Sequence, residues 1–559
     1  MNDMNEIVIV KPDKCVGCNA CLRACPAPEA NVVQYMNDGK IVITVNPAKC
    51  ISCGECLRVC NHGARDYVDD TEECMSKLGN EKLVIIATPA LKTAYPTQWK
   101  GILDFFVEKN CYVYDISYGT DICLWAYSRS VSREQRCIIT EPCGAVVKYA
   151  ESYQPKLLKN LAPVHSPVTC EAIYIKQYLN RTNKIAVLSP CIAMKEEIAE
   201  TGFIDYNVTF GKLMEYFDRN GIRIPTNSPD DYDYNYTDVM GLGTDLFPEA
   251  DQFAYKLAEY KKDMLIMQVQ GVQNVYSALD SYANASDQKR PDVYDVYSCQ
   301  FGCIAGPAIG KVQSPFDALG IKRAIRKKAD AKPREANLRG GIQKLFKLFD
   351  DELQIVDFMR SYRTIPQSSM PNMNQLDEAF ASMDKTTDAD KHIDCGACGY
   401  KTCLDMAAAI HRGLNTAESC VYSVKSVLLK RNEELSQNNK KIEELADNCR
   451  SVSERLIQNI DDVNEKFHSV GGINEKAVQK TAAVRSLLIN VCAFCKKNVS
   501  MDAKATEQLV NVINTTISAL DGLDATVREA DGTTGEINNA VKRLSEIANG
   551  LTEEITGKK

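Results

Sequence analysis

Two groups of four cysteines near the start of the chain constrain its fold more than any other feature. The first group is Cys15, Cys18, Cys21 and Cys25, with Pro26 directly after it, and the second is Cys50, Cys53, Cys56 and Cys60. Soft thiolates at such short, repeated spacings are typical ligands of metal centres. We therefore expect residues 1–75 to form a small domain that is organised around bound metal.

This double pattern resembles the bacterial ferredoxins that carry two 4Fe–4S clusters, in which the fourth cysteine of each run ligates the other cluster. The resemblance assigns Cys15, Cys18, Cys21 and Cys60 to one cluster, and Cys50, Cys53, Cys56 and Cys25 to the second. Asn61 stands where a second proline would be usual. Zinc is the alternative, but a zinc site needs only four thiolates and no exchanged fourth ligand.

Length, charge and hydropathy limit the remaining possibilities. A chain of 559 residues is too long for one core, so we expect several domains. The formal net charge is −8 and no long Lys/Arg block occurs, which gives no electrostatic reason to expect nucleic acid or an anionic membrane as a partner. The start of the chain has no basic segment before an apolar run, and no stretch of about 18 apolar residues follows. We expect a cytoplasmic protein whose cysteines bind metal rather than form disulfides.

Three further domains are predicted after the first. Between residues 80 and 385, apolar β runs alternate with amphipathic helices, which indicates a large α/β domain. The β runs lie at residues 83–87, 112–116, 185–189 and 264–269. Residues 386–424 form a compact cysteine segment, and residues 425–559 lack proline and are predicted to be helical. The fold class that follows is multidomain α/β with a helical, coiled-coil tail.

Four cysteines of the large domain lie in distinctive segments: TEPCGAVVKYAE, LSPCIAMKEEIAE and YSCQFGCIAGP, which contain Cys143, Cys191, Cys299 and Cys303. Four thiolates from separate loops are enough to hold one cubane cluster. Glycines beside the last pair allow the backbone to approach a bulky inorganic group closely. The residues alone therefore predict a cluster, but they do not identify a reaction.

These segments resemble the three signature loops of the iron-only (FeFe) hydrogenase family, in the same order and after the same ferredoxin module. The resemblance spans residues 1–330 and includes IIATPALKTAYP, YDISYGTD, SPVTCEAIYIK and VQGVQNV. It implies that Cys143, Cys191, Cys299 and Cys303 ligate the cubane of an H-cluster. It also implies that Cys303 bridges to a diiron site with CO, cyanide and dithiolate ligands. The expected activity is reversible dihydrogen oxidation and proton reduction, with a ferredoxin-type redox partner.

Three residues depart from the pattern of fast members of the family. Pro142 replaces a cysteine that passes protons onward, Met194 aligns with a lysine that contacts cyanide, and Tyr297 replaces a methionine near the bridging carbonyl. Changes around a metal site alter potential and rate. Because Pro142 can neither donate nor accept a proton, the resemblance implies a slow enzyme, similar to the sensory (HydS-like) branch.

The usual glutamates of the proton path are also absent, because the corresponding residues 121–131 read DICLWAYSRSV. Glu141 or Glu197 is a candidate replacement, acting through water. Two alternatives to a slow sensor stay open at this point. One is a conventional hydrogenase linked to ferredoxin, and the other is a non-catalytic iron–sulfur protein that transfers electrons or acts as a scaffold.

The third cysteine segment contains Cys395, Cys398, Cys403 and Cys420. Its form resembles a small 4Fe–4S domain of sensor hydrogenases and corrinoid-linked proteins, and zinc is the alternative. Placed between the large domain and the tail, such a cluster is expected to take electrons released from dihydrogen and to alter what the tail presents to a signalling partner protein.

Two apolar stripes with helical spacing run through the tail. The first comprises Ile442, Leu445, Cys449, Val452 and Leu456, and the second comprises Ile537, Val541, Leu544, Ala548, Leu551 and Ile555. Either an antiparallel hairpin or a homodimeric coiled coil fits both stripes. Cys492 and Cys495 form a CxxC pair whose role the sequence leaves open.

Several other cysteines and histidines have no cluster spacing. We expect Cys74, Cys111, Cys123, Cys137 and Cys170 to be buried as small apolar side chains. His62 and His165 are expected to be surface or packing residues, because thiolates already fill each predicted site.

Overall fold

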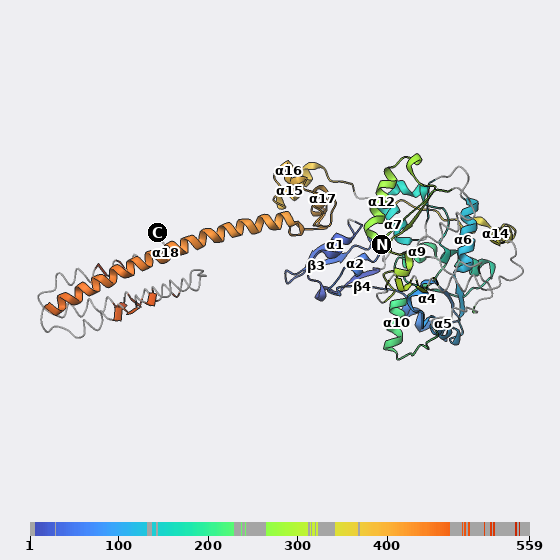
Figure 1. The fold of residues 1–559 in the computed structure, drawn as a ribbon, viewed down its shortest axis with the longest axis horizontal. Helices are drawn as coiled ribbons and strands as arrows, with labels where there is room; N and C mark the ends of the chain where they lie inside the picture. Colours follow the sequence, from blue (N-terminus) through green and yellow to red (C-terminus); the bar gives the residue numbers. More distant parts are fainter. Residues whose placement is uncertain are drawn as a thin grey trace. The chain divides into compact units, whose positions relative to one another are not determined.

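The computed structural model divides the chain into two compact units, residues 1–423 and 424–559 (Figure 1). It describes residues 6–469 except 28, 131–136, 141–142, 229–235, 237–240, 242–263, 311–313, 315, 319, 322, 324–340 and 367–368. Beyond residue 469 it describes isolated positions. Each unit is described separately below.

The N-terminal domain of the first unit consists of two small antiparallel strand pairs and two short helices. Strand β1 (Val8–Val10) pairs with β4 (Arg65–Tyr67), and β2 (Asn31–Tyr35) pairs with β3 (Ile41–Val45), as the alternating pattern of residues 41–45 predicts. Helices α1 (Ala20–Ala24) and α2 (Glu55–Arg58) both begin after a residue in the left-handed region, Asn19 and Gly54. Few apolar side chains fill this domain, and two thiols, Cys15 and Cys21, belong to its core.

The large domain contains two parallel sheets. The four-stranded sheet has the order β6-β5-β8-β9, formed by β5 (Val84–Ala87), β6 (Tyr112–Asp115), β8 (Ile185–Ser189) and β9 (Tyr206–Thr209). The three-stranded sheet has the order β10-β11-β7, formed by β7 (Ile138–Ile139), β10 (Ile266–Gln270) and β11 (Val293–Tyr297). The four β runs predicted from the sequence are all strands. Parallel strands direct their carboxyl ends to one edge, where ligand sites usually form.

Helices cover both faces of the four-stranded sheet. Ile85 and Leu188 face one core, with α5 (Trp99–Glu108) and α10 (Phe210–Arg219), whereas Val84, Ile86 and Val187 face the other. The second core includes α6 (Ser117–Ser130), α8 (Pro167–Ile173) and α14 (Gly341–Glu352). Near-continuous apolar strands are expected in a sheet that is buried on both faces.

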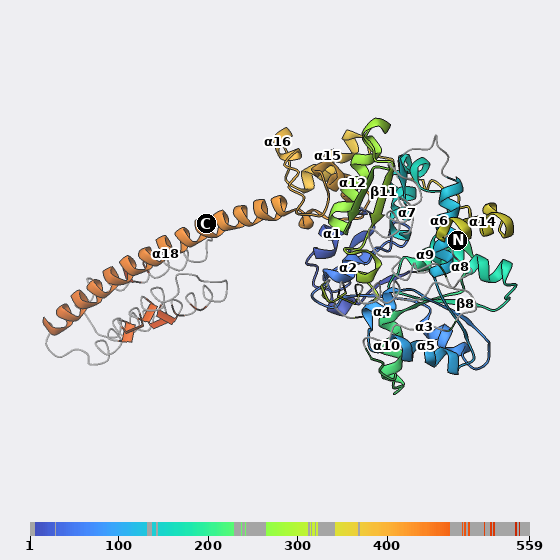
Figure 2. The same ribbon diagram turned by 45° about the vertical axis from the view of Figure 1, so that its right-hand side comes forward.

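Other elements of the large domain complete this scaffold. Helix α12 lies against the three-stranded sheet (Figure 2), where Tyr282 stacks on Tyr294 with ring centroids 5.2 Å apart. The remaining helices that the structure describes in this domain are α3 (Thr71–Lys77), α4 (Ala90–Ala94), α7 (Gly144–Tyr153), a π-helix (Tyr174–Tyr178), α9 (Met194–Thr201), α12 (Val272–Asn284) and four short 3-10 helices (Pro155–Asn160, Asp287–Lys289, Gly302–Ala305 and Ile355–Phe358). Helix α8 begins at a proline that follows its N-cap Ser166, whose hydroxyl accepts a hydrogen bond from the Thr169 amide.

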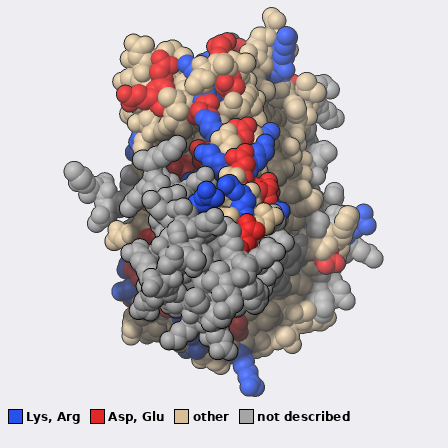
Figure 3. Space-filling model, turned by 90° about the vertical axis from the view of Figure 1, so that its left-hand side faces the viewer, with Lys and Arg blue, Asp and Glu red and all other residues tan. Residues whose placement is uncertain are grey.

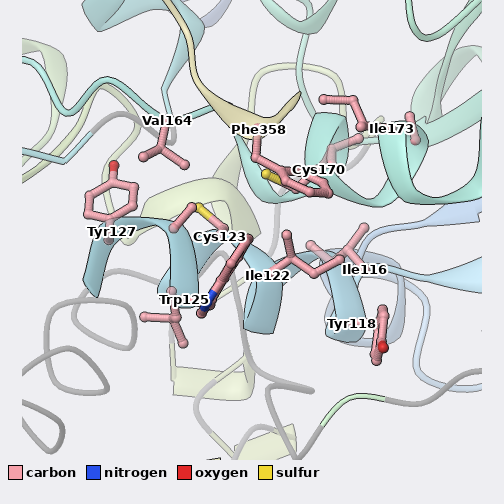
Figure 4. Close-up of a cluster of buried hydrophobic side chains, with 14 of the residues drawn as sticks. Ile116, Tyr118, Ile122, Cys123, Trp125, Tyr127, Val164, Cys170, Ile173 and Phe358 are labelled. Carbon is pink, nitrogen blue, oxygen red and sulfur yellow. The ribbon is translucent and has the colours of Figure 1, made fainter. Parts of the chain in front are cut away.

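Cysteines without cluster spacing are packed as apolar side chains. Figure 4 shows Cys123 and Cys170 between α6 and α8, among Ile122, Ile173 and Phe358. Both thiols donate to the carbonyl oxygen of His165 at 3.4 Å. Three further cysteines of this kind are also buried: Cys74, Cys111 and Cys137. His165 is 9% exposed and packs against Phe203, whereas His62 is exposed, as the sequence predicts for residues outside the metal sites.

The third cysteine segment folds around α17 (Cys403–His411), with α15 (Met373–Ser382) and α16 (Asp388–Lys391) beside it. Leu376, Phe380 and Met383 share one core with Met406. Three of the segment's cysteines belong to the same core: Cys398, Cys403 and Cys420. Its core therefore includes residues before 386, where the sequence places the start of this domain. The apolar side chains of α15 are needed because the cysteine loop has too few of its own.

The second unit contains most of α18 (Val421–Ser469), a helix of 49 residues that matches the helical prediction over this range. Within the first predicted stripe, Cys449 and Leu456 are buried and Ile442, Leu445 and Val452 are partly buried. Leu544 of the second stripe is buried as well. The other five residues of that stripe and the CxxC pair lie outside the described residues.

Surface charge is mixed in sign. On the face drawn in Figure 3, Lys and Arg side chains lie among Asp and Glu side chains. This agrees with the absence of a long basic block in the sequence. Among the described helices, none combines the length and the apolar character that crossing a bilayer requires.

Candidate functional site

Four cysteines from three loops of the large domain line one pocket. Its protein-free space is about 680 Å³, and its lining includes Cys143, Cys191, Cys299 and Cys303. Cys191 follows β8 by two residues and Cys299 follows β11 by two residues, so strands of both sheets deliver ligands to the same place. Cys143 precedes the first residue of α7. The pocket thus lies at the carboxyl ends of parallel strands, where α/β folds bind ligands.

Glycines allow the loops that carry these cysteines to approach one another. A Cβ atom at Gly306 would lie 2.4 Å from the carbonyl oxygen of Pro190, and one at Gly144 would lie 3.2 Å from that of Ala193. Since Gly306 is three residues after Cys303, and Pro190 directly precedes Cys191, the first contact brings two cysteine loops together. The sequence prediction concerned close approach of glycine backbone to an inorganic group and stays a prediction, whereas the contacts seen here are between protein loops.

Burial and mutual repulsion make these thiols poor acids without a cation. Burial, with the charge of Cys143, raises the pKa of Cys191 to about 12. Burial and neighbouring thiolates also raise the pKa of Cys299 and of Cys303 well above the usual value. Thiolate is the metal-binding form, so a bound positive centre must supply the missing stabilisation. The donor set therefore fits an iron–sulfur cluster.

Two of the residues that depart from the family pattern also line this pocket, Met194 and Tyr297. Lys195, adjacent to Met194, does not replace the missing lysine, because its Nζ atom pairs with Asp70 at 2.8 Å. Among the described residues that line the pocket, none is Lys or Arg. Pro142 and Glu141 lie outside the described residues.

Glu197 is the one carboxylate among the lining residues that the structure describes. Its side chain is 3% exposed. Its Oε1 atom accepts hydrogen bonds from the Ser166 hydroxyl and, at 2.6 Å, from the Thr169 hydroxyl. Ser166 also lines the pocket. A buried acid that is fixed by two hydroxyls beside a cofactor pocket is suited to hold and pass a proton.

The N-terminal cysteines lie together, beside a buried arginine that sequence reasoning missed. Arg65 donates to the Cys21 sulfur at 3.1 Å, to Asn31 at 2.8 Å and to the Ile43 carbonyl at 3.0 Å. Burial raises the pKa of Cys56 to about 12, although the charge of Arg65 opposes this. A single arginine at the first position of a strand gives no sequence signal that it will contact a cysteine sulfur. Its place beside a thiolate cluster is consistent with stabilising negative charge there.

The second predicted N-terminal cluster site is close to the pocket of the large domain. A Cβ atom at Gly54 would lie 2.3 Å from the Cβ atom of Pro307, which is four residues after Cys303. Tyr276 is buried, and its hydroxyl hydrogen-bonds Ser298 at 2.7 Å. Burial and the charges of Cys53, Cys143 and Cys299 raise the pKa of Tyr276 well above its usual value.

The third cysteine segment lines a pocket of its own, with about 310 Å³ of protein-free space. All four predicted ligands line it: Cys395, Cys398, Cys403 and Cys420. The Asp394 amide donates to the Cys403 sulfur at 3.4 Å. Lys385 also lines this pocket, although its side chain is almost fully buried, and its Nζ atom donates to the Asp390 carbonyl at 2.6 Å.

In the part of the chain that the structure describes, no three His, Cys, Asp or Glu side chains are placed so that they could share a single metal ion. Four cysteines line each of the two pockets, which is the number that a cubane cluster requires and also the number that zinc, the alternative considered from the sequence, requires.

Cysteine-lined sites in a multidomain α/β chain define an iron–sulfur protein. Residues 14–64 match the family model of the 4Fe-4S dicluster domain, and residues 392–422 match one described as "Putative Fe-S cluster". Residues 108–307 match the model of the iron only hydrogenase large subunit, C-terminal domain. The chain therefore combines a hydrogenase-type domain with iron–sulfur domains on both sides of it.

Solved structures similar to this chain include several [FeFe]-hydrogenases. One is from a study of oxygen inactivation of the H cluster and another from a study of stepwise H-cluster assembly, each 12% identical with a TM-score of 0.41. A variant of HydA1 from Chlamydomonas reinhardtii is 13% identical with a TM-score of 0.40. Each match covers 52% of this chain and 98% of the other. None of the curated proteins matches the chain.

Proposed function

We propose that this protein is an FeFe hydrogenase that oxidises dihydrogen and reduces protons reversibly at an H-cluster. The observation that carries the proposal is the meeting of Cys143, Cys191, Cys299 and Cys303 around one buried pocket, within the segment that matches the hydrogenase family. These four thiolates would hold the cubane, with Cys303 as the bridge to a diiron site bearing CO, cyanide and dithiolate ligands. When bound, such a group supplies the Lewis acid and the base that split dihydrogen.

The residues that line the pocket have different roles in this proposal. Met194 and Val168 contribute apolar surface that limits water, while Tyr297 lies where it can contact the bound group. Glu197 receives or returns the proton through its carboxylate, which Ser166 and Thr169 hold in position. Electrons leave through the N-terminal cluster sites, since Gly54 packs against Pro307 beside the pocket.

We further propose that turnover is slow and that the protein reports dihydrogen or redox state to a partner protein. The apolar replacement Met194, with Lys195 engaged by Asp70, leaves no described cation to contact a cyanide ligand. Cys420 directly precedes the first residue of α18, so the third site is joined to the helix that leads into the second unit. Such an arrangement suits signalling better than rapid turnover.

Infrared spectroscopy of anaerobically matured protein tests the central proposal. Bands in the CO and cyanide region that shift when inert gas is replaced by dihydrogen are the expected result. Turnover far below that of a conventional hydrogenase, measured on the same sample, supports the sensory role, whereas rapid turnover favours the ferredoxin-linked alternative. Absence of the bands, while a control hydrogenase matures in parallel, rejects the hydrogenase proposal and leaves an electron-transfer or scaffold protein.

A further inference from the structure

The third cysteine segment packs against the N-terminal domain. The Val33 amide donates to the Leu414 carbonyl at 3.0 Å, which joins β2 to the loop after α17. The Tyr35 hydroxyl donates to Glu418 at 2.9 Å. Arg412 forms an ion pair with Glu29, and Glu29 in turn pairs with Lys49 at 3.1 Å. These residues are far apart in the sequence, so the chain order alone does not reveal the contact.

The backbones of the third segment and of the N-terminal domain approach each other closely at Gly399 and Leu22, each of which is next to a predicted cysteine ligand. Gly399 has φ +93°, and a Cβ atom there would lie 2.8 Å from the carbonyl oxygen of Leu22. Gly399 directly follows Cys398, and Leu22 directly follows Cys21 in α1. Since consecutive Cα atoms are only about 3.8 Å apart, Cys398 of the third site lies a short distance from Cys21, a predicted ligand of the first N-terminal cluster. The second N-terminal cluster is reached by a different contact, described next.

Tyr400 lies between the third site and the second N-terminal site. It lines the third pocket, and it also lines a second cavity together with Glu29 and Lys49. Its side chain is 4% exposed. Burial, with the charges of Cys398 and Cys25, raises the pKa of Tyr400 to about 12. Cys25 is a predicted ligand of the same N-terminal cluster as Cys53, the cluster that lies near the pocket of the large domain.

We infer that the N-terminal site formed by Cys25, Cys50, Cys53 and Cys56 is a branch point. It exchanges electrons with the pocket of the large domain past Gly54 and Tyr276, and with the third cysteine site past Tyr400. The inference rests on the proposed function for the identity of the groups bound. Each transfer moves one electron, so that the donor site is oxidised and the acceptor site is reduced, and no covalent bond changes.

The branch point changes the route expected from the order of domains. The residues that line the third pocket include none that line the pocket of the large domain. The third segment also contacts the large domain directly, through an ion pair between Lys401 and Asp280 of α12 at 2.6 Å. The inferred route runs through the N-terminal domain because Gly399, Arg412 and Glu418 join the third segment to that domain. In the proposed function the same domain exchanges electrons with an external redox partner. The oxidation state of the third site would then report the balance between dihydrogen and that partner, rather than dihydrogen alone.

Electron paramagnetic resonance of the full-length, anaerobically matured chain tests this inference. After chemical reduction with dithionite, we expect magnetic coupling between the reduced third site and a reduced N-terminal site. Gly399→Ala, which places a Cβ atom against the Leu22 backbone, should abolish that coupling while iron content stays unchanged. Gly413→Ala is the matched control, because its φ is also positive, at +69°, but a Cβ atom there meets nothing within 4 Å.

A charge reversal provides a second test if Gly399→Ala fails to assemble the third site. Arg412→Glu should weaken the coupling by repelling Glu29, and the double variant with Glu29→Lys should restore it. Coupling that is unchanged in both Gly399→Ala and Arg412→Glu would overturn the inference. Because dithionite reduces the clusters without hydrogenase activity, coupling without infrared bands would reject only the proposed function, and bands without coupling would reject only the branch point.

Discussion

At the scale of single residues, the structure shows the surroundings of Glu197, which the sequence alone does not reveal. Glu197 is a candidate proton carrier in a region where the family's usual glutamates are absent, and the structure places it in the lining of the pocket. Glu197→Gln keeps the size of the side chain but removes the titrating carboxyl group. We expect dihydrogen oxidation and proton reduction to fall by about 100-fold to 10,000-fold, the usual cost of removing a positioned acid–base group.

The matched control is Glu196→Gln, because Glu196 is the next residue but bonds Ser52 and Lys148 instead of the two hydroxyls. Activity of the two variants should be compared with that of the unaltered protein under the same conditions. Infrared bands that stay unchanged would show that the cofactor is intact. Equal activity of both variants would exclude Glu197 as the proton carrier.

Lys385 gives a second prediction at this scale. Its ammonium group is buried in the lining of the third pocket and should stabilise the more negative, reduced form of a bound cluster. Lys385→Met should therefore lower the reduction potential of that site by roughly 60 mV, which corresponds to one tenfold change for a one-electron couple. Spectroscopic redox titration measures the shift. Lys391→Met is the control, because that lysine pairs with Asp377 on α15 and does not line the pocket.

Residue types and spacing predicted which cysteines are metal ligands. They did not reveal which groups the neighbouring charged side chains contact. The sequence places Lys195 next to Met194, but it does not reveal that the Lys195 ammonium pairs with Asp70 and does not line the pocket. Asp70 is 125 positions away in the sequence. Arg65 is likewise brought to the Cys21 sulfur by a contact distant in the chain, 44 positions away. Lys385 instead bonds the Asp390 carbonyl only five positions away, so its place in the lining of the third pocket depends on the local fold of that segment.

At the scale of elements, the junction of two cysteine loops depends on Gly306. Gly306→Ala places a Cβ atom 2.4 Å from the Pro190 carbonyl oxygen. This distance is too short for a non-bonded contact, so one of the two backbones would have to move. Since Pro190 precedes Cys191, the variant should lose the cluster of the large domain and its infrared bands. The N-terminal clusters should remain, as seen in their visible absorption. Gly320→Ala is the control, because nothing lies within 4 Å of a Cβ atom there.

Helix α18 offers a test of the packing of the second unit. Leu456 is fully buried and Leu435 is 58% exposed on the same helix. Leu456→Ala should lower the unfolding free energy of that unit by about 2–5 kcal/mol, as for other buried leucines. Leu435→Ala should change it by less than about 0.5 kcal/mol. Denaturant unfolding followed by circular dichroism compares the two, and equal effects would contradict a packed stripe.

Periodicity predicted the elements best where both faces of a strand are buried, as in β5 and β8. Short strands were harder to find. β7 has only two residues, and β9 has polar residues within it, so neither produces an apolar run. The sequence also could not indicate that α15 completes the core of the third cysteine segment, because that packing depends on side chains from separate helices.

At the scale of the whole molecule, the separate pockets predict that cluster sites can be removed independently. Cys398→Ser should remove roughly four iron atoms, the content of one 4Fe–4S cluster, and leave the infrared bands of the large domain in place. Iron analysis and infrared spectra of the same sample check both parts. Loss of the infrared bands in this variant would show instead that the third site supports the large-domain pocket.

The contact between Gly54 and Pro307 has a consequence for biogenesis. The loop that carries Gly54 also carries Cys53 and Cys56, and small metal-bound domains often fold only when their metal binds. We therefore expect the wall beside the large-domain pocket to be complete only after the N-terminal domain has received its iron. Under the proposed function, ordinary iron–sulfur assembly would then precede delivery of the diiron unit.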